Sequence, residues 1–207
     1  DLSPAVEAHQ RGRLDEAENL YRAALAADGK NAEAWHLLGL LHMQRKNFES
    51  AAEYIRSALA ITGPTGVYLT DLGVVLKSLG RPAEAVTVLK QAAALEGSSF
   101  ATLFALGNAL QDDGSLTEAV SACQRAVDLK PESAPAHNNL GNALQGLGRV
   151  DEAAVSYERA IELQPDHGRA HYNLGLLLRD KGRAAAAIEH LQRALALMPH
   201  LDEARVA

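Results

Sequence analysis

The sequence is poor in aromatic residues and cysteine, and it has no long apolar run. Aromatic side chains make up 4% of the 207 residues although 47% are hydrophobic. A core built mainly from Ala, Leu and Val favours closely packed helices over a sandwich or barrel. A single cysteine, Cys123, excludes an internal disulfide framework and favours a reducing cytoplasm. Apolar runs such as residues 174–178 are far shorter than the ~18–20 residues of a membrane helix, so no membrane span is expected.

Positive charge is also scarce. Lys and Arg number 20 against 26 Asp and Glu, which gives a formal net charge of −6. A nucleic-acid-binding protein gathers basic residues on one face, whereas here they are scattered along the chain. The balance of charge therefore argues against a nucleic-acid partner.

A period of 34 residues runs through the whole chain. Self-similarity at such an interval is the signature of a repeat architecture. Glycines recur every 34 residues, at Gly39, Gly73, Gly107, Gly141 and Gly175. Two series of alanines with the same spacing begin at Ala17 and Ala24. We expect one array over residues 1–207, with a partial repeat at 1–31, full repeats at 32–65, 66–99, 100–133, 134–167 and 168–201, and the start of a further helix at 202–207.

Each repeat is predicted to be a helical hairpin. With the repeated glycine numbered as position 8, apolar or small residues at positions 4, 7, 8 and 11 follow one face of a first helix, helix A. Position 15 is Gly in all units but one, where it is Lys46, and this predicts a left-handed residue in the turn. Positions 20, 24 and 27 form one stripe of a second helix, helix B. Small residues at positions 8, 20 and 27 let the two helices approach closely.

This pattern resembles that of the tetratricopeptide repeat family. The matching residues are Trp35, Leu38, Gly39, Ala51 and Ala58 in one unit, and Leu140, Gly141, Ala153, Tyr157, Ala160 and Pro165 in a later one. His42 and Cys123 depart from the family pattern. The resemblance implies an all-α fold, a right-handed superhelical solenoid of stacked hairpins whose A helices line a concave face.

Little in the sequence indicates catalysis or a cofactor. The glycines lie at helix-packing or turn positions, and neither a phosphate-binding loop nor a paired-cysteine metal motif is present. His167 and His171 are four residues apart, but His167 falls in a loop and His171 occupies position 4, which favours packing over metal binding. Cys123 at position 24 is interpreted as a core thiol. We therefore expect no enzyme activity, no metal site and no cofactor.

The surface of helix A is the candidate binding site. Positions 5, 9 and 12 form its inner stripe, which changes from apolar to amide-rich along the chain. Amides both donate and accept hydrogen bonds, so they can bind a peptide backbone without demanding a particular side chain. Lys77 and Arg179 could pair with acidic groups of a peptide. The predicted peptide-binding residues are Asn108, Gln111, Asn138, Asn139, Asn142, Gln145, Tyr172, Asn173, Lys77 and Arg179.

Two functions compete. The first is a protein-interaction scaffold that binds an extended peptide or partner protein. The second is the substrate-recruiting arm of a larger glycosyltransferase, because His-x-Asn-Leu-Gly at 137–141 and 171–175 resembles the repeats of O-linked N-acetylglucosamine transferases. That resemblance implies an Asn ladder along the concave face, which Asn139 and Asn173 match and Leu37, Asp71 and Ala105 do not.

Two further expectations concern partners. Family members that clamp an acidic C-terminal tail place Lys and Arg at positions 2, 5 and 6, whereas this chain has residues such as Glu33 and Asp71 there, so this partner is disfavoured. End-to-end self-association is expected, because no polar helix follows residues 202–207 to cover the last hairpin. Leu191, Leu195 and Leu197 are candidates for that apolar end face.

Overall fold

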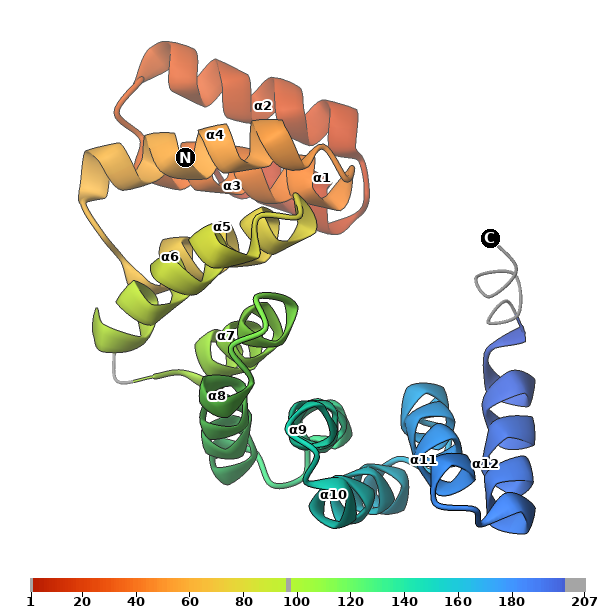
Figure 1. Ribbon diagram of the computed structural model, residues 1–207. Helices are drawn as coiled ribbons and strands as arrows, with labels where there is room; N and C mark the ends of the chain where they lie inside the picture. Colours follow the sequence, from red (N-terminus) through yellow and green to blue (C-terminus); the bar gives the residue numbers. More distant parts are fainter. Residues whose placement is uncertain (1, 96–97, 200–207) are drawn as a thin grey trace. The chain divides into compact units, whose positions relative to one another are not determined.

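The described residues, 2–95 and 98–199 of the computed structural model, form helices and no strands (Figure 1). Helices A and B alternate along the chain, as the all-α repeat fold requires. The helices are α1 (Ser3–Gln10), α2 (Leu14–Ala27), α3 (Ala32–Gln44), α4 (Phe48–Thr62), α5 (Gly66–Ser78), α6 (Pro82–Leu95), α7 (Phe100–Asp112), α8 (Leu116–Leu129), α9 (Ala134–Gly146), α10 (Val150–Leu163), α11 (Gly168–Asp180) and α12 (Ala184–Leu197).

The chain divides into two compact units, residues 1–109 and residues 110–207, and each is described by itself. In the first unit, α1 packs on α2, α3 on α4 and α5 on α6; in the second, α9 packs on α10 and α11 on α12. The further helix predicted at 202–207 lies outside the described residues. In the described parts of the chain, no helix combines the length and apolarity that a membrane span requires.

The turn between the two helices of each hairpin is left-handed, as predicted from position 15. The glycines at this position have φ of 70° to 80°. Lys46, the one non-glycine there, also has φ of 60°. The conformation is therefore imposed by the hairpin, and glycine is the residue that adopts it without a steric cost.

Close approach of helices A and B explains the glycine at position 8. A Cβ atom built on Gly39 would lie 2.7 Å from Ile55 Cγ1, and one on Gly141 would lie 2.5 Å from the Tyr157 ring. Ile55 and Tyr157 both occupy position 24 of helix B. Any larger residue at position 8 would wedge the hairpin apart, since packed interiors have no spare volume.

The cores consist of small and aliphatic side chains, with two tyrosines at position 24. In the first unit, Tyr21 is fully buried among Ala8, Ala17 and Leu38. In the second unit, Tyr157 is fully buried against α9. The core composition therefore follows the prediction of Ala- and Leu-rich packing, with aromatic rings only where a hairpin leaves room for them.

Candidate functional site

The second unit gathers four of the predicted amide residues and one tyrosine into one hydrogen-bonded group, the amide cluster, which consists of Asn138, Asn142, Gln145, Tyr157 and Asn173. The Asn173 Nδ2 atom of α11 lies 3.0 Å from Asn138 Oδ1 and 2.8 Å from Asn142 Oδ1 on α9. Neighbouring A helices are thus joined through their amide side chains. This contact uses positions 5 and 9 of one repeat and position 6 of the next.

The Tyr157 hydroxyl anchors the amide cluster from helix B. Its oxygen lies 2.8 Å from Asn142 Oδ1 and 2.7 Å from Gln145 Oε1. Burial raises the pKa of Tyr157, so the hydroxyl keeps its single proton and donates it to one of the two amides. Asn142 Oδ1 also accepts from Asn173 Nδ2, so this oxygen joins helix B to both neighbouring A helices.

Some hydrogen-bonding capacity of the amide cluster is left for a partner. Asn138 is only 4% exposed, whereas Asn142, Gln145 and Asn173 are half-buried. Within residues 2–95 and 98–199, neither Asn142 Nδ2 nor Asn173 Oδ1 has a hydrogen-bond partner. The cluster therefore offers at least one donor and one acceptor at an accessible surface, held in place by bonds to neighbouring helices.

Other predicted residues of the second unit lie outside the amide cluster. Asn139 Oδ1 is 3.5 Å from Asn138 Nδ2, at the edge of the group. Gln111 Nε2 lies 3.8 Å from the Cys123 sulfur. Arg179 is exposed and bonds to the adjacent Asp180 at 3.0 Å, and Tyr172 is half-buried. The structure thus places the Asn138 and Asn142 side chains, rather than Asn139, against Asn173.

The first unit has different chemistry on its A helices. His36 Nε2 lies 2.7 Å from Asp71 Oδ2, and the His36 ring stacks on Tyr68 with centroids 4.2 Å apart. Thr70 and Thr102 share a buried hydrogen bond of 2.9 Å. Asn108 and Lys77 belong to this unit and are described with it alone. The contacts between A helices in the first unit are thus polar, although the stripe was expected to be apolar at this end of the chain.

Sequence reasoning missed the link between position 24 and position 12. It assigned Tyr157 to the core by its spacing, but the hydroxyl reaches Gln145 twelve residues earlier. The same spacing joins Tyr21 to His9, with 3.2 Å between the hydroxyl and Nδ1. A tyrosine at position 24 together with a polar residue at position 12 is the signal that could have predicted both contacts.

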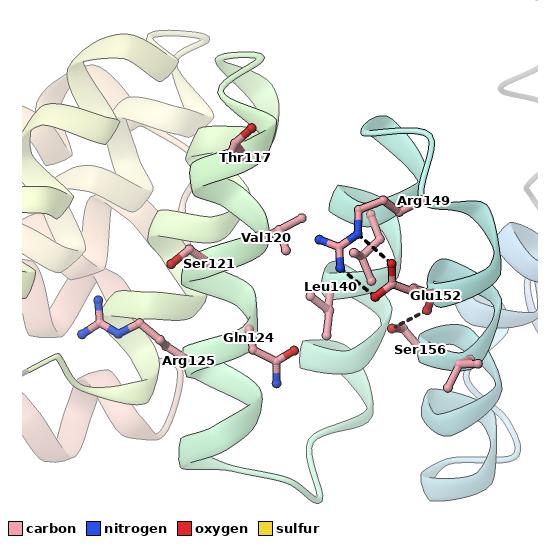
Figure 2. Close-up of a pocket in the computed structure, with 11 residues that line it drawn as sticks. Thr117, Val120, Ser121, Gln124, Arg125, Leu140, Arg149, Glu152 and Ser156 are labelled. Atoms are coloured by element: carbon pink, nitrogen blue, oxygen red, sulfur yellow. Dashed lines mark hydrogen bonds and ion pairs between the residues drawn. The ribbon is translucent and has the colours of Figure 1, made fainter.

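A surface pocket of about 570 Å³ lies between α8 and α10 in the second unit (Figure 2). Leu140 and Leu144 of α9 are among the residues that line it, and both are buried. Gln124 lies on the α8 side, and Arg149 forms a two-pronged ion pair with Glu152 on the α10 side. The sequence analysis placed the candidate binding site on helix A, so this pocket was not predicted.

Cys123 and His167 lie in surroundings that fit structural roles. Burial raises the pKa of the Cys123 thiol to about 12, which suits a core residue and opposes a thiolate nucleophile. His167 caps α11 by accepting the Ala170 N–H through Nδ1 at 3.1 Å, so it is not paired with His171. The described residues contain no group of three or more His, Cys, Asp or Glu side chains that could hold a metal ion.

The side chain at position 4 makes the same hydrogen bond in three repeats, although it is Trp in one and His in the other two. Trp35 Nε1 donates to the carbonyl oxygen of Gly29 at 3.0 Å, His137 Nε2 to Pro131 at 2.9 Å and His171 Nε2 to Pro165 at 3.1 Å. In each of these three repeats, the acceptor carbonyl lies six residues before the ring. The ring nitrogen thus ties helix A to the end of the preceding helix B, which agrees with a packing role for His137 and His171.

Known families and structures match the chain over most of its length. A tetratricopeptide repeat family model matches residues 5–65, 70–134 and 138–201. No curated protein matches the sequence. Among solved structures, residues 41 to the end of MamA from Desulfovibrio magneticus RS-1 are 23% identical with a TM-score of 0.74, covering 83% of this chain and 97% of that one.

Two other solved structures share the fold. PilW, described as a widely conserved type IV pilus biogenesis factor, is 21% identical with a TM-score of 0.87, covering 99% of this chain and 94% of its own. YrrB, described as a repeat protein with an unusual peptide-binding site, is 23% identical with a TM-score of 0.69, covering 87% of this chain and 93% of its own. At these identities the likeness shows the fold.

Proposed function

Because the chain belongs to the tetratricopeptide repeat family, we propose that it is a non-catalytic protein-interaction module whose second unit binds an extended polypeptide along α9 and α11. The observation that carries the proposal is the amide cluster. Its amides are fixed by bonds between helices, yet Asn142 Nδ2 and Asn173 Oδ1 keep hydrogen-bonding capacity within the described residues. A fixed donor and acceptor can meet the carbonyl and N–H of a peptide backbone.

The peptide-binding site of YrrB supports the proposal by analogy of fold. The proposed contacts are Asn139, Asn142, Gln145, Tyr172 and Asn173 in the second unit. Gln111, Asn138 and Arg179 remain in the proposal for the second unit, with Arg179 directed at acidic side chains. Asn108 and Lys77 belong to the first unit and stay separate predictions, with Lys77 directed at acidic side chains. Binding of an unstructured ligand is expected to be roughly micromolar, because the ligand must be ordered.

A library of unstructured peptides selected on the wild-type chain provides the test. Selected peptides are then titrated against Asn139→Ala/Asn173→Ala, and against Asp71→Ala as the matched control. Asp71 occupies position 6 in the first unit, as Asn173 does in the second. We expect at least a tenfold loss of affinity for the double variant and no change for the control. Unchanged affinity in a double variant with the wild-type circular dichroism spectrum would rule out the amide cluster as the binding site.

The alternative function, a recruiting arm of a glycosyltransferase, stays a prediction. It rests on Asn139 and Asn173 at the position of the family's Asn ladder. The full-length reading frame tests it directly, since a covalently attached transferase domain would be visible there. The cytoplasmic location is likewise a prediction, tested by fractionation of the natural host.

End-to-end self-association is a separate proposal, and one of its three candidate residues needs correction. Leu191 lies within the hairpin, because a Cβ atom on Gly175 would be 2.7 Å from Leu191 Cγ. Leu195 is 37% exposed and remains a candidate, as does half-buried Leu197. Light scattering over a concentration series tests the proposal, and Leu195→Glu should abolish any association that this face mediates.

A further inference from the structure

The first unit has an apolar row at position 9 of its A helices. Val6 of α1, Leu40 of α3 and Val74 of α5 occupy this position in three consecutive repeats. Val74 is 37% exposed, and Val6 and Leu40 are half-buried. In the second unit the same position holds Asn142 of the amide cluster. The first unit therefore offers apolar contacts where the second offers amides.

The three A helices that carry this row are neighbours. His9 Nε2 of α1 lies 3.0 Å from Gln44 Oε1 of α3, and His36 Nε2 of α3 lies 2.7 Å from Asp71 Oδ2 of α5. The axes of packed helices are about 8–10 Å apart, so the side chains of the row recur at about that interval.

This interval selects one conformation of a bound chain. A polyproline II segment has about three residues per turn and rises about 3.1 Å per residue, so one of its faces repeats about every 9 Å. A β-strand shows the same face every second residue, or about every 6.6–6.8 Å. A polyproline II segment with an apolar side chain at every third position therefore matches the row, whereas a β-strand does not.

A recess of about 520 Å³ at one end of the row has an acidic lining. Leu2, Val6 and Glu7 of α1 line it together with Glu33 of α3. Glu7 pairs with Arg11 at 2.7 Å, but exposed Glu33 makes no ion pair with any residue that the structure describes. A basic side chain suits this recess, because its aliphatic stem can lie on Leu2 and Val6 while its charged end reaches Glu33.

The charge of Glu33 also acts on the next A helix. Burial, and after it the charge of Glu33, raise the pKa of Tyr68 on α5. The Tyr68 ring stacks on His36, which in turn bonds to Asp71. Lys77 is the cation of α5, and it lies three residues beyond Val74 in sequence, at the end of α5 away from Tyr68. The surface beside the recess is therefore complementary to a cation.

We propose that the A-helix face of the first unit binds a polyproline II segment of a partner protein, with an apolar residue at every third position and an arginine beside a terminal one. The apolar side chains contact Val6, Leu40 and Val74, and the arginine enters the recess beside Glu33. This goes beyond the proposed function, because it concerns the other unit and a ligand of different chemistry. A polyproline II chain is already extended before it binds, so little ordering opposes association.

The probe is a dye-labelled heptapeptide with blocked ends, Leu-Arg-Pro-Leu-Pro-Arg-Leu, whose symmetry offers an arginine to Glu33 in either chain direction. One comparison peptide carries citrulline, a neutral isostere, in place of both arginines. Another, Leu-Arg-Leu-Pro-Leu-Arg-Pro, has the same composition with leucine at alternate positions. Fluorescence anisotropy with the full chain at low salt gives the affinities. We expect the probe to bind about twofold to fivefold more tightly than either comparison peptide.

Variants of the first unit then locate the site. Glu33→Gln should weaken binding of the probe about twofold to fivefold and leave the citrulline peptide unchanged. Glu53→Gln removes the same charge from an exposed site on helix B and should change nothing. Val74→Asn installs the residue type of Asn142 and should weaken the probe and the citrulline peptide alike. Circular dichroism checks the fold of each variant.

The double variant Asn139→Ala/Asn173→Ala should bind the probe as wild type does, so this proposal and the proposed function can fail separately. Equal affinity for the probe and the citrulline peptide would overturn the proposal, as would an equal loss in Glu33→Gln and Glu53→Gln. Loss of the probe in the double variant would place the site in the second unit and overturn it too. Equal affinity for the peptide with alternate leucines would overturn the three-residue spacing.

Discussion

The two units join neighbouring A helices through the same repeat positions but with different chemistry. His36 and Asp71 in the first unit, and Asn138 and Asn173 in the second, occupy positions 5 and 6 of consecutive repeats, 35 residues apart. The first pair is a histidine and a carboxylate, and the second is two neutral amides. The register of the hairpins, set by small residues at position 8, therefore fixes where a polar contact forms and leaves its type free.

Glu18 of the first unit lies in a group of ion pairs, in contrast to the amide cluster of the second unit. Glu18 of α2 accepts hydrogen bonds from Arg22 on its own helix and from Arg45 at the end of α3. Asp15 also pairs with Arg45. By contrast, the amide cluster of the second unit contains no ionisable group except the protonated Tyr157 hydroxyl. The first unit should consequently respond to acid and salt where the amide cluster does not.

The largest expected effect comes from removing the ring that supports the amide cluster. Tyr157→Ala deletes a fully buried side chain and the hydroxyl partner of Asn142, so the free energy of unfolding should fall by about 3–5 kcal/mol. Urea denaturation at pH 7 measures it. Cys123→Ala, at the same position of the preceding repeat, is the control and should cost about 1 kcal/mol. Equal losses in the two variants would mean that the hydroxyl and ring add nothing to this position.

Exchanging the residue types at position 6 between the two units should change the free energy of unfolding by a smaller amount. Asn173→Asp places a carboxylate against Asn138 Oδ1 and Asn142 Oδ1, where no donor faces it, so we expect a loss of about 1–3 kcal/mol at pH 7. The loss should shrink as acid protonates the new carboxyl. Asp71→Asn, the reverse change, keeps a hydrogen bond to His36 and should cost about 0.5–1 kcal/mol. Greater damage from Asp71→Asn would contradict the comparison.

Acid sensitivity of the first unit can be isolated at Glu18. The hydrogen bond from Arg22, then that from Arg45, holds the pKa of Glu18 below its ordinary 4.5. A lowered pKa stabilises the fold above the ordinary value, and this contribution disappears as pH falls through the lowered value. Glu18→Gln should therefore cost about 0.5–1 kcal/mol at pH 7, and the cost should shrink progressively as the pH falls from 4.5 through the lowered pKa. A pH-independent difference in urea midpoints would contradict this account.

Much of the fold was predictable because it follows from spacing. The left-handed turn at Gly148, the contact of Gly141 with position 24 and the alternation of helices A and B all depend on backbone geometry, which the 34-residue period reports directly. Asn138 and Asn142, which the period puts on the same stripe of helix A, both bond to Asn173. Spacing places a residue on a helix face with an uncertainty of one position, and this is enough for packing.

The details of the site were less predictable, because side-chain partners depend on rotamers and on the neighbouring helix. Asn138, Asn142 and Asn173 were predicted to share a surface, but the bonds from Asn173 to Asn138 and Asn142 were not. The His171 contact with His190 crosses from helix A to helix B, so it does not follow from the spacing within either helix. Contacts between helices require the inter-helix geometry, which a single sequence does not specify.

The smallest expected effect concerns the turn that both units share, and it asks whether Lys46 is strained. Lys46 has φ of 60° where Gly148 has 74°. A left-handed residue with a Cβ costs about 1–2 kcal/mol, and the extra chain entropy of glycine offsets about 0.5–1 kcal/mol of that. Lys46→Gly should therefore stabilise the chain by about 0.5–1 kcal/mol. Gly148→Lys should destabilise it by a similar amount, because a Cβ on Gly148 meets nothing within 4 Å and only the backbone cost applies. Urea denaturation of the two variants beside wild type gives both numbers. Lower stability in Lys46→Gly would show that the exposed Lys46 side chain stabilises the first unit by more than its backbone strain costs.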